Sequence, residues 1–242
     1  MPIKIAFDEN FLTKLLLDSD VNFPNENFSD VYNIKSPNGG PLKHLLNNRC
    51  DIALLSIIDY GLAQKESDIR IIKGPALCLK GNCGIIGLNF KSGVSEIKSI
   101  GEKKLPDILH KTTSVLLSER YNIESKSLEI KNDADVNIVN GEATLDLSED
   151  WMDSFAHSLP LYFWCAKSEE LSISGKKALE LLNILCQTNS EQIEINSDGS
   201  GEIIRSWNTE LEHDTDQALE TFYYHGALPE IYASKFFGDI ME

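Results

Sequence analysis

The chain has 242 residues, of which 42% are hydrophobic and 25% are charged, as in folded proteins that bury a sizeable core. Its formal net charge of −16 argues against binding to nucleic acid or to an anionic membrane surface, because both need a basic footprint. No run of about 18 apolar residues could span a membrane, and the N-terminus lacks the apolar core of a signal peptide. We therefore expect a cytoplasmic protein.

Neither a metal nor a cofactor is predicted. The five cysteines are an odd number in otherwise apolar segments, which indicates buried free thiols: Cys50, Cys78, Cys83, Cys165 and Cys186. The closest pair has no zinc-knuckle spacing, and no second pair completes four ligands. No dinucleotide-binding or phosphate-binding glycine loop follows the first predicted strand.

The first 75 residues alternate between strand-like and helix-like segments. Short apolar runs predict strands, and leucines at i, i+3, i+4 spacing predict helices. In chain order these are strand 3–7, helix 11–16, strand 31–34, helix 42–46, strand 52–55 and strand 69–72. The polar stretch 18–30 is predicted to be a loop.

The apolar run Ile52 to Leu55 has the character of a strand buried on both faces of a parallel sheet. It ends abruptly at Ser56. Ligands of open α/β sheets bind beyond the carboxyl ends of the strands, so Ser56 is a candidate ligand contact. A serine at this place also suits the cap of a following helix, and both roles are compatible.

The rest of the chain predicts a second lobe and a return to the first. Extended segments at 76–79 and 84–88, with several glycines, indicate a crossover into the second lobe. Further predicted elements are strand 97–100, a helix at 115–121 opened by Thr112 to Ser114, strands 128–130 and 136–139, a helix starting at 146–151, a return strand 159–166, and helices 178–185, 215–224 and 229–237.

These elements predict an α/β fold of two lobes joined by two crossover strands, with a ligand cleft between the lobes. Lobe 1 comprises residues 1–81 and 161–242, so it holds both termini. Lobe 2 comprises residues 82–160, which are inserted between the two parts of lobe 1.

Six segments in a fixed order carry a resemblance to a known family: CDIALLSIIDYG at 50–61, GPALCLKGNCGIIGL at 74–88, KTTSVLLSERY at 111–121, DADVNIVNGEATL at 133–145, DLSEDW at 146–151 and LPLYFWCA at 159–166. The chain resembles the bacterial menaquinone-biosynthesis family that includes chorismate dehydratase and 1,4-dihydroxy-6-naphthoate synthase of the futalosine route. The resemblance covers residues 40 to 166 and implies the fold of type 2 periplasmic binding proteins.

The resemblance implies a chorismate dehydratase-like lyase, which removes water from a cyclic dicarboxylate without a cofactor. The alternative is a non-catalytic protein of the same fold that binds a small carboxylate. In both cases we expect a small anionic metabolite as the partner and a monomer or homodimer as the assembly.

The resemblance also implies site residues. Substrate-binding positions lie at the strand end, on the crossover, at the opening of the helix and in a turn facing the cleft: Ser56, Lys80, Gly81, Asn82, Thr112, Thr113, Ser114 and Gly141. Glu142 replaces the aspartate of the family's turn and is a candidate catalytic carboxylate or a solvated turn residue. The Thr-Ser pair suits an anion at a helix N-terminus or a plain helix cap.

Two departures from the family put the reaction, more than the fold, in question. The family's Tyr-Leu-Asn and Pro signature after the first strand is replaced by FDENFLTKLL, in which Asn10 is the candidate catalytic stand-in for the asparagine. The serine-rich crossover is replaced by Lys80 to Cys83, where Lys80 either charges the carboxylate site or is exposed. His110 and His157 are further candidates for a base, although surface or capping roles suit them better.

A transcriptional effector domain of the LysR type shares this fold but requires a DNA-binding helix-turn-helix. No such segment precedes the first strand, and the acidic charge does not favour DNA binding.

Overall fold

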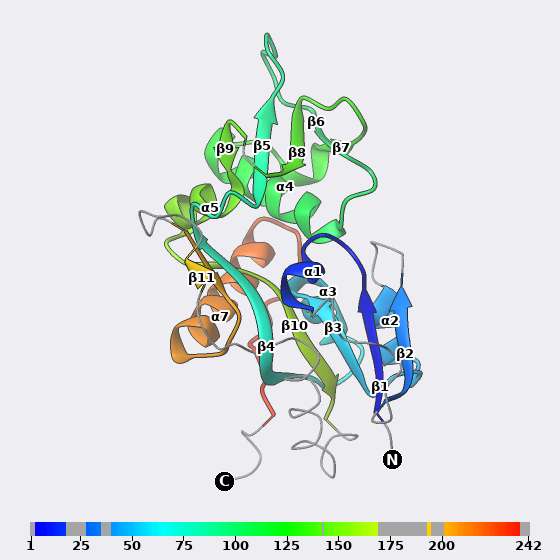
Figure 1. Cartoon of the computed structure of the whole chain (residues 1–242). Helices are drawn as coiled ribbons and strands as arrows, with labels where there is room; N and C mark the ends of the chain where they lie inside the picture. Colours follow the sequence, from blue (N-terminus) through cyan, green and yellow to red (C-terminus); the bar gives the residue numbers. More distant parts are fainter. Residues whose placement is uncertain are drawn as a thin grey trace.

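The computed structural model describes residues 3–17, 28–34, 40–141, 143–168, 193–194 and 201–237. In these ranges the chain forms two β-sheets, and each sheet carries its own helices (Figure 1). We call the part built on the larger sheet lobe 1 and the part built on the smaller sheet lobe 2. The predicted fold class, an α/β protein of two lobes, is confirmed.

Lobe 1 contains a seven-stranded sheet in the order β11-β12-β4-β10-β3-β1-β2. Its strands are β1 (Ile3–Asp8), β2 (Phe28–Ile34), β3 (Ile52–Ser56), β4 (Ile69–Gly81), β10 (Leu159–Lys167), β11 (Ile193–Glu194) and β12 (Gly201–Ile204). β1 runs parallel to β2 and β3, whereas β10 runs antiparallel to both β3 and β4. The helices of this lobe are α1 (Thr13–Leu16), α2 (Gly40–Leu46), α3 (Ile57–Ala63) and α7 (Thr209–Tyr224).

Lobe 2 contains a five-stranded sheet in the order β7-β6-β8-β5-β9 and lies above lobe 1 in Figure 1. Its strands are β5 (Ile86–Phe90), β6 (Ser99–Gly101), β7 (Glu129–Ile130), β8 (Val136–Asn140) and β9 (Leu145–Asp146). Two α-helices, α4 (Asp107–Tyr121) and α5 (Leu147–Phe155), and the short 3-10 helix η1 (Ser125–Ser127) complete it. None of the helices in the described ranges is long and apolar enough to cross a membrane.

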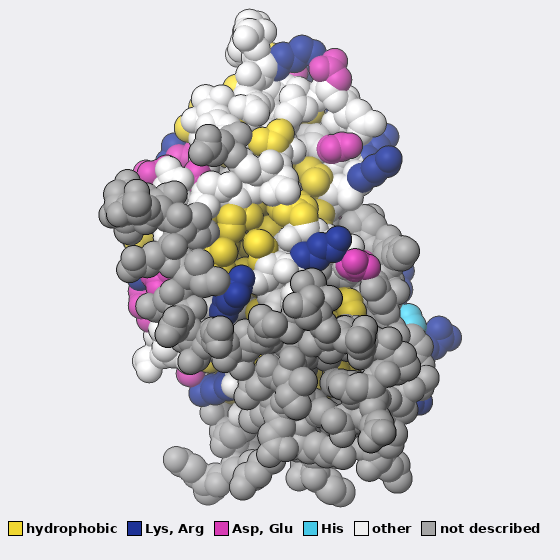
Figure 2. Space-filling model, viewed as in Figure 1, with side chains coloured by type: hydrophobic (Ala, Val, Ile, Leu, Met, Phe, Trp, Pro, Cys, Tyr) yellow, Lys and Arg dark blue, Asp and Glu magenta, His cyan; other side chains and the backbone are white. Residues whose placement is uncertain are grey.

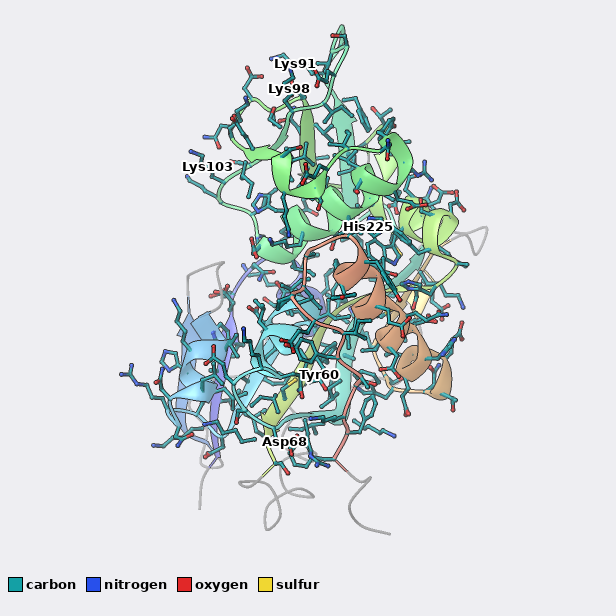
Figure 3. The ribbon with its side chains drawn as sticks, turned by 180° about the vertical axis from the view of Figure 1, so that it is seen from behind. Tyr60, Asp68, Lys91, Lys98, Lys103 and His225 are labelled. Carbon is teal, nitrogen blue, oxygen red and sulfur yellow. The ribbon has the colours of Figure 1, made fainter. Side chains whose placement is uncertain are left out.

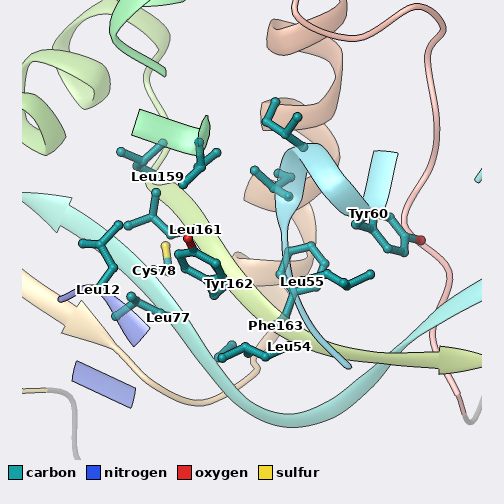
Figure 4. Packing of buried hydrophobic residues seen from close by; sticks show 14 of the residues in the cluster. Leu12, Leu54, Leu55, Tyr60, Leu77, Cys78, Leu159, Leu161, Tyr162 and Phe163 are labelled. Atoms are coloured by element: carbon teal, nitrogen blue, oxygen red, sulfur yellow. The ribbon is translucent and has the colours of Figure 1, made fainter. Parts of the chain in front are cut away.

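The centre of the lobe 1 core is the fully buried strand β3. All five of its residues are buried, as expected for a strand with sheet neighbours and covering side chains on both faces. Figure 4 shows Leu54 and Leu55 of β3 beside Phe163 of β10. The ring of Tyr60, from α3, meets the Phe163 ring edge-on at a centroid distance of 5.4 Å. The apolar run that predicted a buried strand therefore forms the centre of the lobe 1 core.

Most predicted strands are confirmed with small shifts at their ends, but β4 differs. The segments predicted separately at 69–72 and 76–79 form one strand of 13 residues. Its pairing with β10 shifts register between Phe163, which faces Ala76, and Cys165, which faces Ile71. The residues between Ile71 and Ala76, including Gly74 and Pro75, bulge without ending the strand.

The prediction that Thr112 to Ser114 open a helix is wrong, because α4 already begins at Asp107. Pro106 directly precedes the helix, and Asp107 places a carboxylate in its first turn, where the helix dipole favours negative charge. Thr112 and Thr113 are fully buried in the middle of the helix. Threonine is common at helix caps, so the sequence placed the start of this helix about one and a half turns too late.

The C-terminal prediction needs two corrections. α7 begins at Thr209, earlier than the predicted residue 215, and Asn208 caps it by accepting a hydrogen bond from the Leu211 amide at 2.7 Å. Residues 229–237 form no helix. Their backbone bonds to lobe 1 instead: the Ile71 amide donates to the Lys235 carbonyl at 2.7 Å, and the Lys235 amide donates to the Tyr60 hydroxyl at 2.8 Å. The helix predicted at 178–185 lies outside the described residues.

Helix α7 holds the two lobes together on one side. Trp151 of α5 is fully buried, and its ring lies 5.2 Å from that of Phe222 of α7. At the end of α7, the His225 carbonyl accepts a hydrogen bond from the Ser125 hydroxyl at 2.6 Å, and its ring contacts the Ser118 hydroxyl at 3.3 Å. Figure 3 shows His225 at this junction, directly below lobe 2.

We expect Trp151→Ala to lower the free energy of unfolding by about 3–5 kcal/mol, because it leaves a cavity between α5 and α7. Urea denaturation measures this change. Tyr224→Ala is the control, since Tyr224 is 72% exposed and its loss should change stability by less than about 0.5 kcal/mol. Equal stability of the Trp151 variant and the parent protein would contradict this interlobe contact.

Candidate functional site

Five polar side chains meet where β1 and β3 end, and we call this group the strand-end site: Asp8, Asn10, Ser56, Asp59 and Tyr162. β1 and β3 are parallel, with Ile5 beside Ile52 and Ala6 beside Ala53, so their carboxyl ends lie at one edge of the sheet. β10 brings Tyr162 opposite Ser56. This edge is where open α/β sheets bind ligands.

Ser56 and Asp59 form a reciprocal cap at the start of α3. The Ser56 hydroxyl accepts a hydrogen bond from the Asp59 amide at 3.1 Å and donates one to the Asp59 carboxylate at 2.9 Å. Ser56 has an exposed fraction of only 4%. The capping role of Ser56 is therefore present in the structure, and it fixes the Asp59 carboxylate at the strand end.

Asn10 fixes the turn that follows β1. Its amide oxygen accepts hydrogen bonds from the amides of Leu12 at 2.9 Å and Thr13 at 3.1 Å. Its amide nitrogen donates to the Tyr162 hydroxyl at 3.4 Å. Thr13 in turn donates its hydroxyl to the Asp8 carbonyl at 2.7 Å. Asn10 therefore connects the end of β1 to β10 within the site.

Asp8 is the last residue of β1, and its side chain is 7% exposed. Its carboxylate has no hydrogen-bond or ion-pair partner among the residues that the structure describes. Burial and the nearby Asp59 carboxylate raise the pKa of Asp8 to about 7. A carboxyl group with this pKa exchanges protons readily at neutral pH, as general acids and bases do.

The surroundings of Asp8 are acidic. Burial raises the pKa of Asp59 to about 6, with Asp107 adding to the shift and the hydrogen bond from Ser56 opposing it. Burial also raises the pKa of Tyr162, and Asp59, Asp8 and Asp107 contribute to that shift. Asp107 is the first residue of α4, so the beginning of a lobe 2 helix lies close enough to act on this edge of lobe 1.

The crossover residues predicted as ligand contacts bond to α5, α7 and β12 instead of the strand-end site. Lys80 pairs with Glu210 at 2.7 Å, so its charge is already matched. The Gly81 carbonyl accepts a hydrogen bond from Ser148 at 2.8 Å, and Gly81 pairs with Gly201 of β12.

The remaining crossover and turn residues do not join the strand-end site through any described hydrogen bond. The Asn82 side chain donates to Glu149 at 3.0 Å. Gly141 makes a turn with a φ of 105°, which favours glycine, and its amide donates to the Ile85 carbonyl at 2.9 Å. Glu142 lies outside the described residues.

The predicted anion site on α4 lacks a helix N-terminus in the structure, because Thr112, Thr113 and Ser114 lie inside the helix. The Thr112 and Thr113 hydroxyls are buried and have no hydrogen-bond partner among the described residues. The Ser114 hydroxyl donates to the His110 carbonyl at 2.8 Å, within the helix. The physical basis of that prediction, free amides at a helix start, does not exist at these residues.

Both candidate histidine bases are buried in structural hydrogen bonds. The His110 ring contacts the Glu102 carbonyl at 2.8 Å. The His157 ring contacts the Ser158 carbonyl at 2.8 Å and the Thr221 hydroxyl at 3.3 Å, and burial lowers its pKa. Both histidine rings therefore make structural contacts that hold backbone segments and helices together.

Asp8, Asp59 and Tyr162 were not among the site residues predicted from the sequence. Asp8 directly follows a predicted strand, and Asp59 follows Ser56 by three residues, the spacing of a capping box. The strand-end rule applied to β1 would have found Asp8. The pairing of β10 with β3, which supplies Tyr162, has no local signal in the sequence.

The described residues contain no cluster of three or more His, Cys, Asp or Glu side chains arranged to hold a metal ion. A pocket of about 430 Å³ lies on lobe 2, between Phe90, Tyr121 and Ile123. No residue of the strand-end site lines this pocket.

We expect Asp8→Asn to stabilise the protein at high pH. The pKa of Asp8 rises from 3.8 to about 7 on folding, so the folded state binds this proton more tightly and stability falls as pH rises between these values. Asparagine cannot ionise. The gain should grow from near zero at about pH 4 to about 1–3 kcal/mol at about pH 8, measured by urea denaturation.

Asp133→Asn is the matched control, because the Asp133 side chain is 83% exposed and pairs with Lys91 only at the surface. A gain in the Asp8 variant that is the same at both pH values would show that Asp8 does not titrate in this range.

No protein-family model and no curated protein matches the chain. Solved structures do match it. The chain is similar to protein AF1704 from Archaeoglobus fulgidus, with 11% identity over 94% of this chain and 98% of that chain and a TM-score of 0.52. It is similar to the periplasmic aliphatic sulphonate binding protein SsuA from Escherichia coli, with 10% identity over 100% of this chain and 95% of that chain and a TM-score of 0.50.

It is also similar to the alkanesulfonate-binding protein SsuA from Xanthomonas axonopodis pv. citri bound to MOPS, with 13% identity over 95% of this chain and 94% of that chain and a TM-score of 0.54. At such identities the likeness shows the fold alone, and none of these matches supports the predicted menaquinone-biosynthesis family. The chain has the two-lobe α/β fold of the type 2 periplasmic binding proteins.

Proposed function

We propose that the chain binds a small polar metabolite at the strand-end site, between its two lobes. The observation that carries this proposal is the buried Asp8 carboxylate, which has no partner among the described residues, at the carboxyl ends of parallel strands. Burying an ionisable group without a partner costs free energy, and sites that bind ligands retain such groups. The SsuA proteins of the same fold are named for binding sulphonates, which are small polar molecules.

The surface of this region suits a small organic ligand. Figure 2 shows hydrophobic side chains gathered at the waist of the molecule, where the two lobes meet, with Lys or Arg and acidic side chains beside them. Pockets for small molecules combine apolar walls with a few polar groups that fix the orientation of the ligand. The strand-end site would supply those polar groups.

A lyase similar to chorismate dehydratase is the second candidate, and the pKa of Asp8 favours it. Dehydration requires a base that takes a proton from carbon and an acid that protonates the departing hydroxyl. With a pKa of about 7, Asp8 would serve as the base, while Asn10 and Tyr162 would position the substrate. A cyclic dicarboxylate would have to bind beside Asp59, which requires that the carboxylates of the ligand find donors elsewhere in the site.

We expect Tyr162→Phe to weaken ligand binding about fivefold to tenfold, because it removes one hydrogen-bonding hydroxyl and leaves the ring in place. Isothermal titration calorimetry measures this change after a melting-temperature screen of chorismate, MOPS and amino acids has identified a ligand. Tyr60→Phe is the matched control. It removes a buried hydroxyl whose one hydrogen bond among the described residues is accepted from the Lys235 amide, so it should leave the affinity unchanged.

Equal affinity of the Tyr162→Phe variant and the parent protein would show that the ligand binds outside the strand-end site. Conversion of chorismate to an aromatic product, lost in Asp8→Asn, would establish the lyase. Binding of chorismate without conversion would exclude it.

A further inference from the structure

We propose that the strand-end site binds the ammonium group of a small amine between Asp8 and Asp59, and that an oxygen of the same ligand accepts a hydrogen bond from Tyr162. This inference rests on the proposed function and names its ligand class. It differs from the anionic metabolite expected from the sequence.

The negative charge of the site is not balanced by any described cation. Asp8 and Asp59 lie on adjacent elements of lobe 1, and the Asp107 carboxylate of lobe 2 acts on Asp59 from across the junction. No Lys, Arg or His among the described residues forms an ion pair with Asp8 or Asp59. A buried carboxylate is stable when it is protonated or paired with a cation. A cationic ligand would therefore complete the site.

Most hydrogen-bond donors of the site are already used within it. The Ser56 proton is already used on Asp59, and the Asn10 amide nitrogen donates to the Tyr162 hydroxyl. The Tyr162 hydroxyl, on a residue with 5% exposure, donates to no acceptor among the described residues. Figure 4 shows this hydroxyl pointing toward the end of β10 where lobe 2 begins. The site thus offers one donor and two carboxylate acceptors.

These groups match a ligand that carries several donors and one nearby acceptor. An ammonium group has three N–H donors and no acceptor, which suits two carboxylates. A hydroxyl, carbonyl or carboxylate oxygen close to the nitrogen would accept from Tyr162. Amino acids and amino alcohols have this pattern, whereas a dicarboxylate has acceptors only and would face Asp8 and Asp59 with like charge.

A divalent metal ion is the main competitor for two carboxylates. Calcium takes six to eight oxygen ligands, more than the described part of the site supplies, whereas magnesium keeps several waters and needs only one or two carboxylates. Metal binding without amine binding is therefore an outcome that would overturn the inference.

The test compares amines with analogues that lack the nitrogen. Isothermal titration calorimetry uses the twenty amino acids, 2-aminoethanol and 4-aminobutanoate as probes, with acetate, butanoate, chorismate, MOPS, calcium and magnesium as the comparison set. At least one amine should bind with a Kd below about 1 mM, and its deaminated analogue should bind at least about tenfold more weakly. Asp8→Asn should weaken the amine at least about tenfold, and Asp133→Asn should not change it.

The pH dependence is a second readout. Binding requires ionised Asp8, so affinity for the amine should rise about tenfold from pH 6 to pH 8, as the group titrates with a pKa of about 7. Asp59, Tyr162 and Asp107 are the groups that act on this region from other elements, and all three are acids. Asp59, with a pKa of about 6, carries a negative charge over most of this range and strengthens the attraction for a cation, whereas burial raises the pKa of Tyr162 and keeps its hydroxyl neutral, so neither reverses this direction.

The outcomes separate the two proposals. Anions that bind and are weakened by Tyr162→Phe, with no amine binding, would overturn this inference and keep the proposed function. Amine binding that Asp8→Asn does not weaken would also overturn the inference. No binding of any probe in either set would overturn both.

Discussion

The double pairing of β10 holds the structure together. This strand returns from lobe 2 and inserts antiparallel between β3 and β4, so it joins the parallel half of the larger sheet to the half that leads into lobe 2. Eight of its nine residues are buried, which ties the position of the strand to the whole core. Because Tyr162 lies opposite Ser56 in this pairing, the same strand that closes the fold also completes the strand-end site.

The local patterns that the sequence shows clearly are the ones that proved correct. The apolar run at β3 and the acidic start of α5 each depend on neighbouring residues alone, and Asp146 caps α5 by accepting from the Ser148 and Glu149 amides. The α/β fold of two lobes followed from the succession of such patterns. Of the residues grouped in the strand-end site, Ser56 was a candidate because it ends a predicted strand, and Asn10 was a candidate through the family resemblance.

The features that the sequence did not predict depend on contacts between segments far apart in the chain. The segment 229–237 contains good packing residues at helical spacing, yet its backbone finds partners on β4 and on Tyr60, and these replace the helix. The burial of Asp8 and its proximity to Asp59 result from the pairing of β1 with β3 across 47 positions of the chain. Propensity and spacing carry no information on such encounters.

The attachment of α7 to lobe 2 has a consequence for how the lobes can move. Trp151 packs on Phe222, and His225 bonds to Ser118 and Ser125, so one flank of the junction is fastened by an aromatic stack and by hydrogen bonds. Relative rotation of two bodies fastened along one flank displaces the fastened side least and the opposite side most. This flank would therefore act as the pivot of any such rotation, and the opposite side of the junction would move most.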